Sequence, residues 1–229
     1  MNAKVVFFDI CNTLVEGAAL SARRLLSARL ELTEKETHRA GKLLMTHPAE
    51  SPEDLLVPLG RLLPRFGEER LRRELTELWE EQLRAARPFP GAVELVAGLR
   101  GLGLKTGLVS NIWHPFYQSF ADACPEIAEN VDYTVLSYRL GIKKPDPEIY
   151  REALRLAVVP PRRCWMVGDS IEQDIQPAMA GGMRTMLIVS RPERERRPLA
   201  ALLRGELPRP HHAEADLAGA LAFFQRSLA

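Results

Sequence analysis

Residues 4–13, KVVFFDICNT, contain the stretch that decides the fold. Its first half is β-branched and aromatic without alternation, which is typical of a strand buried on both faces of a sheet. Strands of that kind belong to parallel sheets that are covered by helices. The run stops at Asp9, so an acidic side chain follows the strand directly. We therefore predict a buried first strand at Lys4–Phe8 with a polar residue at its carboxyl end.

Outward from this strand, the second half of the chain alternates between strand and helix patterns. Short apolar runs predict strands at 105–110, 133–136, 164–168 and 185–189. Segments of helical period predict helices at 91–102, 114–121, 147–156, 171–180 and 217–226. Such alternation is typical of parallel strands joined by crossover helices. The predicted fold class is therefore α/β, with a Rossmann-like parallel-sheet core that has helices on both faces.

The stretch from residue 17 to residue 87 has a different character. Leu, Arg, Glu and Ala dominate it, and apolar residues recur at helical spacing in segments 18–30, 33–45, 52–66 and 68–86. No part of it reads as a strand, and Arg87-Pro88-Phe89-Pro90-Gly91 follows as a stiff linker. We therefore predict a helical cap domain at 17–87, inserted into a core that is formed by 1–16 and 88–229.

The composition argues against several classes of protein. The chain has 229 residues, of which 31 are basic and 30 acidic, so a formal charge of +1 gives no support for binding nucleic acid or a membrane surface. No apolar stretch approaches the roughly 18 residues of a membrane span, and the first residues lack a secretory signal pattern. The three cysteines follow no CxxC spacing and are odd in number. We expect a cytoplasmic protein with reduced thiols.

Polar residues stand where the predicted strands end or the next helix begins: Asp9, Ser110, Asn111, Lys144, Asp169 and Asp174. In open parallel sheets, ligands bind outside the carboxyl ends of the strands. Carboxylates that meet there need neutralisation, which a divalent cation with oxygen ligands provides. The set is therefore typical of a hard-metal and oxyanion site that is suited to phosphoryl transfer.

Each of these residues also has a purely structural interpretation. A strand-terminal Asp caps turns, Ser110 is a good helix N-cap, and Lys144 before a proline fits a solvated surface. Asp169 and Asp174 fit the start of the following helix, where the dipole favours acidic residues. Their joint occurrence at the strand ends of one sheet favours the functional interpretation.

Four segments of the chain resemble the motifs of the haloacid dehalogenase superfamily of hydrolases. They are FFDICNTLV at 7–15, LVSN at 108–111, GIKKPDPEIY at 141–150, and MVGDSIEQDI at 166–175 followed by AMAGGM at 178–183. The resemblance extends over the whole chain, because the helical block falls where that family carries an α-helical cap between its first two motifs. It implies the family's fold and a hydrolytic activity.

The resemblance also implies roles for the residues that handle the substrate. Asp9 stands at the nucleophile position, where a covalent aspartyl intermediate forms. Ser110, with Asn111 beside it, matches the position that binds the phosphoryl oxygens. Lys144 matches the cation that neutralises the nucleophile and the phosphoryl group, in preference to its neighbour Lys143.

A magnesium site is implied in the same way. Asp9 and Asp169 match its carboxylate ligands, and Cys11 would contribute its backbone carbonyl. Asp174 matches the acidic residue that ligates the metal through water or supports the site. We therefore expect Mg²⁺ as the cofactor, with oxygen ligands throughout.

Cys11 departs from the pattern of the family's phosphatases, which usually carry a second Asp two positions after the nucleophile. That carboxyl protonates the leaving alcohol and later takes a proton from the attacking water. A thiol with an ordinary pKa near ~8.5 is a poor substitute. General acid–base help is worth about 10²–10⁴-fold, so its loss predicts slow turnover. As a nucleophile, Cys11 has no His nearby in the sequence to activate it.

The residues fit several functions. A Mg²⁺-dependent phosphatase that acts on a small phosphorylated metabolite is favoured, because Asp169 and Asp174 are retained. A 2-haloacid dehalogenase needs no acid for its leaving halide, yet such enzymes use no magnesium and typically have Ser-Ser-Asn at Gly168-Asp169-Ser170. A carbon–phosphorus hydrolase needs a cap lysine, for which Lys35 and Lys42 are the candidates. The further alternative is a catalytically weak phosphate-binding or regulatory module.

The residues that select the substrate are less defined. The predicted cap begins with three arginines, Arg23, Arg24 and Arg29, which fit either a substrate anion or a solvated helix surface. Ser110-Asn111 is followed by Trp113 and His114, which fit either the border of the pocket or packing and capping at the start of a helix. The charge run Arg191–Arg197 is interpreted as a solvated loop and His211-His212 as a surface pair. The oligomeric state is left open.

Overall fold

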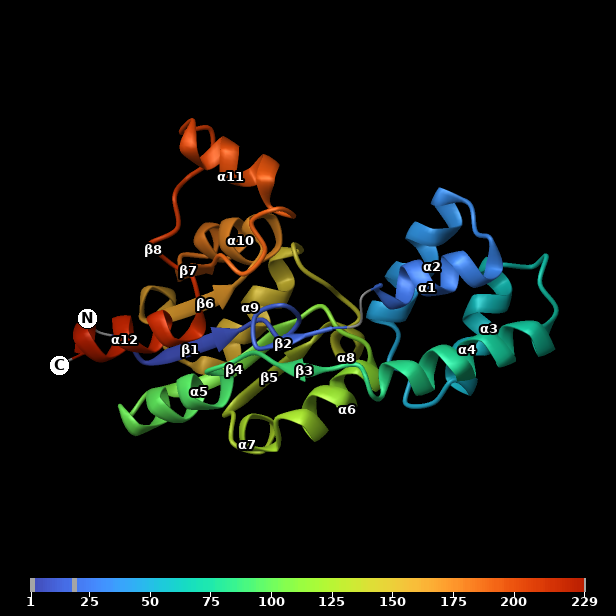
Figure 1. Cartoon of the computed structure of the whole chain (residues 1–229), viewed down its shortest axis with the longest axis horizontal. Coiled ribbons are helices and arrows are strands. Elements are labelled where there is room, and N and C mark those ends of the chain that lie inside the picture. Colours follow the sequence, from blue (N-terminus) through green and yellow to red (C-terminus); the bar gives the residue numbers. More distant parts are fainter. Residues whose placement is uncertain (1–2, 18–19, 229) are drawn as a thin grey trace.

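A six-stranded sheet forms the centre of the computed structural model, which describes residues 3–17 and 20–228 (Figure 1). The strand order is β5-β4-β1-β6-β7-β8, and all neighbouring strands are parallel. The strands are β1 (Val5–Phe8), β4 (Lys105–Ser110), β5 (Tyr133–Leu136), β6 (Cys164–Gly168), β7 (Arg184–Ile188) and β8 (His212–Glu214).

The first strand lies in the middle of this sheet, as its apolar sequence requires. All residues of β1 are buried, and successive side chains point to opposite faces, so that Phe7 and Phe8 belong to different core clusters. In register, Phe8 stands beside Leu108 of β4 and Val167 of β6. The three strands therefore end close to the same level, which brings the residues that follow them to one edge of the sheet.

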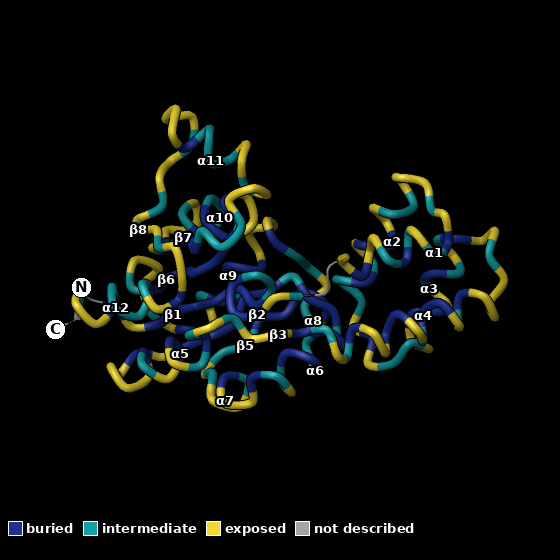
Figure 2. Tube along the Cα trace, in the orientation of Figure 1, coloured by how far each residue is buried: buried dark blue, intermediate teal, exposed yellow. Residues whose placement is uncertain are grey.

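Helices cover both faces of the sheet (Figures 1 and 2). On the face of Phe8, the core includes residues of α5 (Ala92–Gly101), α6 (His114–Ala123), α7 (Pro125–Ala128) and α12 (Leu217–Leu228). On the face of Phe7 lie α9 (Pro147–Ala157) and α10 (Gln176–Ala180), and α11 (Arg196–Leu203) packs beyond them on β7. The short helix α8 (Ser137–Leu140) follows β5, a 3₁₀ turn at Pro161–Arg163 precedes β6, and a π-helical turn at Ile171–Ile175 follows β6.

Four further helices lie together at one side of the sheet (Figure 1). They are α1 (Ala22–Leu30), α2 (Glu34–Thr46), α3 (Glu53–Leu62) and α4 (Glu68–Gln82). Each helix buries leucines, such as Leu26, Leu44, Leu59 and Leu75, while its other side is exposed (Figure 2). These helices form where the sequence predicts the cap.

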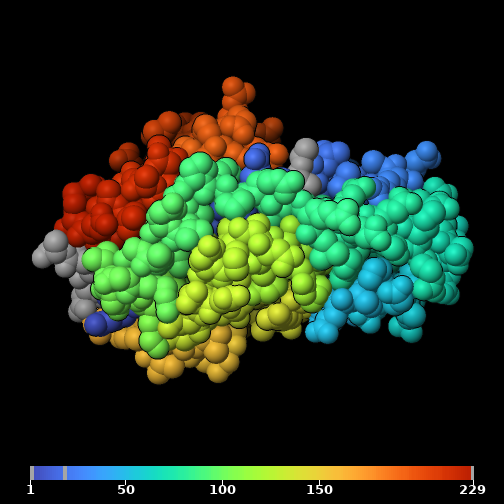
Figure 3. Space-filling model, turned by 60° about the horizontal axis from the view of Figure 1, so that its bottom comes forward, coloured from blue at the N-terminus to red at the C-terminus, as the bar shows by residue number. Residues whose placement is uncertain are grey.

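The four-helix group joins the rest of the chain through a short antiparallel ribbon. Val15 and Glu16 (β2) pair with Pro88 and Arg87 (β3). The segment expected as a stiff linker, Arg87–Gly91, thus begins with a two-residue strand. Further contact comes from α4, whose Trp79 meets Trp113 edge to face with ring centroids 5.5 Å apart. In Figure 3 the segment from α4 to α5 forms one continuous surface over α6 and α7.

The predicted fold class is confirmed, and the strands expected from the apolar runs are present within one residue of their predicted bounds. The strand β8 was not predicted. It contains His212, whose ring stacks on Phe223 of α12 with centroids 3.8 Å apart, so the interpretation of His211-His212 as a surface pair in a loop is wrong for His212, whereas His211 is exposed and precedes the strand. Among the described residues, no helix is both long and apolar enough to cross a membrane.

Candidate active site

The carboxyl edge of the sheet holds Asp9 at its centre. Its backbone N–H donates to the Val167 carbonyl at 3.0 Å, which continues the pairing of β1 with β6 by one residue. The chain then turns sharply, since the N–H groups of Thr13, Leu14 and Val15 all point to the carbonyl of Ile10. Asp9 is 5% exposed and lies between the buried ends of the neighbouring strands.

The side chain of Lys144 places a positive charge at this edge of the sheet. Its Nζ donates to Asp9 Oδ1 at 2.6 Å, to Asp174 Oδ1 at 2.6 Å and to the carbonyl of Val109 at 3.0 Å. These three acceptors satisfy the three protons of an ammonium group. Burial alone would lower the pKa of Lys144, but the Asp174 and Asp9 carboxylates raise it above its usual value. Lys144 is therefore charged and fixed.

Ser110 completes the contacts of one Asp9 oxygen. Its hydroxyl donates to Asp9 Oδ1 at 3.0 Å, and that oxygen also accepts from Lys144. In the described part of the chain, Asp9 Oδ2 accepts no hydrogen bond. One carboxylate oxygen is thus anchored by two donors, which leaves the other for a ligand or a reacting atom.

Asn111 binds the protein itself. Its Oδ1 accepts from the backbone N–H of Lys144 at 2.7 Å, and its Nδ2 donates to the Lys144 carbonyl at 2.9 Å and to Gln173 Oε1 at 3.1 Å. The amide therefore clamps the backbone of Lys144 to the end of β4. This contact supports a positioning role, and the substrate-binding role of Asn111 stays a prediction.

Asp174 is fully engaged by protein groups. Besides its bond to Lys144, its Oδ2 accepts from the backbone N–H of Ser170 at 3.0 Å. A Cβ on Gly168 would lie 2.5 Å from this carboxylate, so the glycine makes room for it. Burial raises the pKa of Asp174 to about 7, against the attraction of Lys144. These contacts favour support of the site over direct ligation of a metal.

Asp169 has a partner that the sequence did not predict. The guanidinium of Arg191 donates to Asp169 Oδ2. Burial, followed by the charge of Asp9, raises the pKa of Asp169 to about 6, although Arg191 opposes the rise. The interpretation of Arg191–Arg197 as a solvated loop is therefore wrong for Arg191, because the segment after β7 folds back over the end of β6.

The carboxylates of this edge fit a divalent metal. Oxygen atoms of Asp9, Asp169 and Asp174 all lie within 4.8 Å of one another, and all three residues are buried. Asp9 and Asp169 offer hard oxygen donors of the kind that Mg²⁺ prefers. The pKa of Asp169 is raised because burial and the nearby charge of Asp9 disfavour its ionised form. A bound cation would offset both effects. The Cys11 thiol does not add to this donor set, because burial and the nearby Asp9 raise its pKa and keep it protonated.

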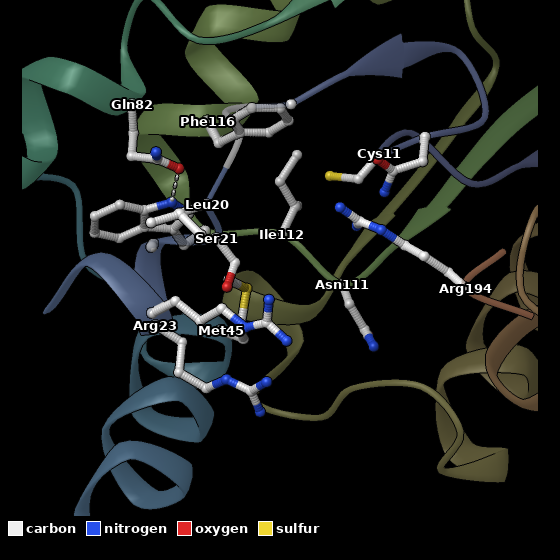
Figure 4. Close-up of a pocket in the computed structure, with 15 residues that line it drawn as sticks. Cys11, Leu20, Ser21, Arg23, Met45, Gln82, Asn111, Ile112, Phe116 and Arg194 are labelled. Carbon is white, nitrogen blue, oxygen red and sulfur yellow. Dashed lines mark hydrogen bonds between the residues drawn. The ribbon is translucent and has the colours of Figure 1, made fainter. Parts of the chain in front are cut away.

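Two adjoining cavities open at this edge. The smaller, about 270 Å³, is lined by Asp9, Lys144, Asp169 and Asp174 together with their neighbours. The larger, about 600 Å³, lies between the sheet edge and the four-helix group (Figure 4). Cys11, Asn12, Asn111 and Arg194 line both. Cys11 thus stands at the passage from the carboxylate cluster to the larger space.

Of the residues expected near the substrate, some line the larger cavity and others contact residues elsewhere in the protein. Arg23, Arg24 and Trp113 line the larger cavity. Arg29 pairs with Glu81 on its own helical group, and His114 stacks on Trp79 with centroids 5.7 Å apart. Arg194 was not predicted, because a single arginine in a charged run has no period or motif to mark it.

Comparison with known proteins gives consistent matches. A sequence model described as haloacid dehalogenase-like hydrolase matches residues 3–182. The glyceraldehyde 3-phosphate phosphatase of Methanothermobacter thermautotrophicus is 30% identical over 202 residues, which cover 82% of this chain and 86% of that protein. The protein of the same name from Pyrococcus abyssi is 27% identical over 191 residues, 80% of each chain. A solved 2-haloacid dehalogenase from Pseudomonas syringae shares the fold with a TM-score of 0.64 at 19% identity, over 98% of this chain and 99% of that one.

Proposed function

Since the chain belongs to the haloacid dehalogenase-like hydrolases, we propose that it hydrolyses the phosphate monoester of a small metabolite through a covalent intermediate on Asp9. The observation that carries this proposal is the state of the Asp9 carboxylate. Oδ1 is fixed by Ser110 and Lys144, while Oδ2 accepts no hydrogen bond within the described residues. A carboxylate held in this way is oriented for attack.

The reaction takes place in two steps. Asp9 Oδ2 forms a bond to phosphorus as the bond from phosphorus to the leaving alcohol breaks, and the leaving oxygen takes a proton from solvent water. Water then attacks the phosphorus of the aspartyl phosphate, releases inorganic phosphate and restores the carboxylate. Lys144 and Ser110 lie within 3.0 Å of Oδ1 and stabilise the negative charge that accumulates beside it.

Magnesium fits the same proposal. Asp9 and Asp169 would hold the ion, with the backbone carbonyl of Cys11 as a third ligand, and Asp174 would support them through Lys144 and Ser170. When bound, the metal would offset the charge of the phosphoryl oxygens. The raised pKa of Asp169 supports this assignment, since burial and Asp9 disfavour its charge in the absence of a cation.

Cys11 sets the expected rate. Its thiol lies at the passage to the larger cavity, where a leaving alcohol would emerge, and burial raises its pKa well above the ordinary value. A neutral thiol of this kind neither gives nor takes a proton readily near neutral pH. Turnover is therefore slow for alcohols that leave poorly, and faster for leaving groups that need no proton.

The relatives support a small substrate. Two of them carry the name glyceraldehyde 3-phosphate phosphatase, which implies a phosphorylated compound of three carbons for those proteins. For this chain we infer a phosphate monoester of similar class. The larger cavity, about 600 Å³, is of the size that holds a small metabolite. We infer that residues 17–87 act as the cap that closes over it and that 1–16 and 88–229 form the core. Unpaired Cys11, Cys124 and Cys164 support a cytoplasmic location.

A dehalogenase is the second candidate, because a halide needs no acid and Cys11 offers none. The test is a panel of phosphate monoesters, including p-nitrophenyl phosphate, with Mg²⁺ or with EDTA, beside 2-chloropropionate. Phosphate release that requires Mg²⁺, loss of release in Asp9→Asn and a phosphoryl adduct on Asp9 in acid-quenched protein are expected. Chloride release without metal would establish the dehalogenase instead. Mg²⁺ binding with neither reaction would leave a phosphate-binding module.

A further inference from the structure

The larger cavity carries an excess of positive charge. Among the described residues that line it, the charged ones are Arg23, Arg24 and Arg194, and none is acidic. The whole chain is balanced, with 31 basic and 30 acidic residues, so this composition is a local departure. The cap contributes two of these arginines from the start of α1, and the core contributes the third from the segment after β7.

These arginines lack the carboxylate partners that several other arginines of the chain have. Arg65 pairs with Glu36, Arg72 with Glu68, and Arg155 with Glu152, at distances of 2.6–2.8 Å. In the described part of the chain, the guanidinium groups of Arg23, Arg24 and Arg194 make no hydrogen bond or ion pair. Arg23, Arg24 and Arg194 are exposed, as Arg39 and Arg196 are, and what distinguishes them is that they line one cavity whose described lining residues include no acidic one.

Arg23 occupies a place that the neighbouring helix provides. A Cβ on Gly41 of α2 would lie 2.4 Å from Cδ and 2.7 Å from Cγ of Arg23. The stem of Arg23 therefore lies directly against the backbone of α2, in a space that any larger residue at position 41 would fill. Figure 4 shows Arg23 reaching from the helical side toward the open centre of the cavity.

Arg194 is positioned by anchors on both sides. Three residues before it, Arg191 is bonded to Asp169, and directly after it Glu195 Oε2 accepts from the backbone N–H of Ile171 at 3.0 Å. Between these anchors, the Arg194 side chain extends toward Cys11 and Asn111 from the side opposite to Arg23 (Figure 4). The same residue lines the carboxylate cavity, so it stands beside the place of the phosphoryl group.

Two lysines that do not line the cavity, Lys42 and Lys143, add positive charge near Arg23. Lys143 is half-buried, and its pKa is lowered by burial and by the charges of Arg23 and Lys42. No carboxylate contributes to that environment. Like charges that are collected without counter-ions around a cavity attract an anion into it.

We propose that this cavity binds a second anionic group of the substrate, either a carboxylate or a second phosphate, between the arginines of the cap and Arg194. The preferred substrate is thus a phosphate monoester that bears another negative charge, with the phosphoryl group at Asp9. This inference rests on the proposed phosphatase function for the position of the phosphoryl group. Leu20, Met45, Ile112 and Phe116 line the remaining wall and fit the carbon chain between the two anions.

The test uses the Asp9→Asn chain with Mg²⁺, so that ligands bind without turnover. Calorimetry compares 3-phosphoglycerate with glycerol 3-phosphate, which differ by a carboxylate in place of a hydroxymethyl group. A second pair, fructose 1,6-bisphosphate and fructose 6-phosphate, distinguishes a second phosphate from a carboxylate. We expect at least ~10-fold tighter binding of the anionic member in one pair, as a charged hydrogen bond provides. Equal affinities within both pairs would overturn the proposal.

Variants then assign the preference to residues. Arg23→Ala and Arg194→Ala should each remove most of this preference, measured as the ratio of the two affinities within a pair, whatever the change in glycerol 3-phosphate affinity itself. Gly41→Ala keeps every charge but displaces the Arg23 stem, and should weaken the anionic ligand in the same direction. Arg39→Ala and Arg196→Ala remove exposed arginines outside the cavity and serve as matched controls. A preference that survives in Arg23→Ala and Arg194→Ala, or that falls equally in the controls, would contradict the assignment.

Steady-state kinetics of the wild-type chain separate this inference from the proposed function. If phosphate release occurs, Arg23→Ala should lower kcat/KM for the anionic substrate by a larger factor than for glycerol 3-phosphate. If no phosphate is released from any compound but the binding preference persists, the phosphatase proposal fails and the anion site stands.

Discussion

Replacement of Lys144 by Met tests the central claim about the site. Met keeps an unbranched apolar stem and removes the ammonium that is bonded to Asp9 and Asp174 at 2.6 Å each. The variant leaves three buried carboxylates with Arg191 as their remaining basic contact among the described residues. Because the side chain of Lys144 is 2% exposed, solvent cannot replace the lost charge without opening the structure.

The expected loss of stability follows from this burial. Removing one partner of a buried ion pair costs about 3–5 kcal/mol, since the other charge is left uncompensated. For a denaturation slope of about 3 kcal/mol/M, the urea midpoint should fall by roughly 1 M or more. Mg²⁺ should stabilise the variant more than the wild type, because a cation then neutralises the carboxylates that Lys144 no longer contacts. Binding at a hundredfold excess over Kd contributes about 2.7 kcal/mol.

The neighbouring lysine provides the control. Lys143 is half-buried, its pKa is lowered by burial and by Arg23 and Lys42, and its ammonium has no bonded partner in the described part of the chain. Lys143→Met should therefore change the free energy of unfolding by no more than about 1 kcal/mol. Urea titrations with Mg²⁺ and with EDTA measure both variants. Equal losses in the two variants, or a loss below about 1 kcal/mol in Lys144→Met, would refute the assignment of Lys144 as the buried counter-ion.

Three further changes test the remaining parts of the site. Cys11→Asp should raise phosphatase turnover at least ~10-fold by restoring a carboxyl for proton transfer, and unchanged turnover with normal Mg²⁺ affinity would show that the acid is not limiting. Asp169→Asn should weaken Mg²⁺ binding at least ~10-fold in calorimetry. Asp174→Asn should weaken it much less, because both Asp174 oxygens accept hydrogen bonds from protein donors. A larger loss of Mg²⁺ affinity in Asp174→Asn than in Asp169→Asn would mean that Asp174 is the metal ligand and Asp169 the supporting residue. Arg191→Ala should tighten Mg²⁺ several-fold, since it frees Asp169 Oδ2 and removes a like charge from the metal; weaker binding would mean that Arg191 supports the metal site.

The sheet and its polar edge were predictable because they depend on local sequence. Four apolar residues followed by Asp9 define a buried parallel strand and its carboxyl end without any knowledge of the partners. Sheet geometry then requires that Asp9, Ser110 and Asp169 meet, since the strands that precede them are neighbours in register. The motif segments added Lys144, whose distance along the chain from Asp9 gives no hint of contact.

The contacts of Arg191, Arg194 and Asn111 were not predictable in the same way. Whether Arg191 is solvated or bonded to Asp169 depends on how the segment after β7 folds back, and its sequence carries no period that would fix this path. The clamp from Asn111 to Lys144 joins residues 33 positions apart through an amide, which fits many environments. The strand β8 has three residues that pair with β7, and its His212 stacks against Phe223; neither contact has a signal in the local sequence.

The segment after β7 connects the two halves of the candidate site. Arg191 reaches the carboxylate cluster, Arg194 reaches the larger cavity, and Glu195 fixes both through the backbone of Ile171. A cation at Asp169 would compete with Arg191 for the Asp169 carboxylate, and Arg191 lies three residues before Arg194. The proposed metal site and the proposed anion site thus share the segment from Arg191 to Glu195, through which binding at one would be coupled to binding at the other. An enzyme that lacks a carboxyl at position 11 gains most from such an arrangement, because binding energy from a remote anion can be used to position the phosphoryl group at Asp9.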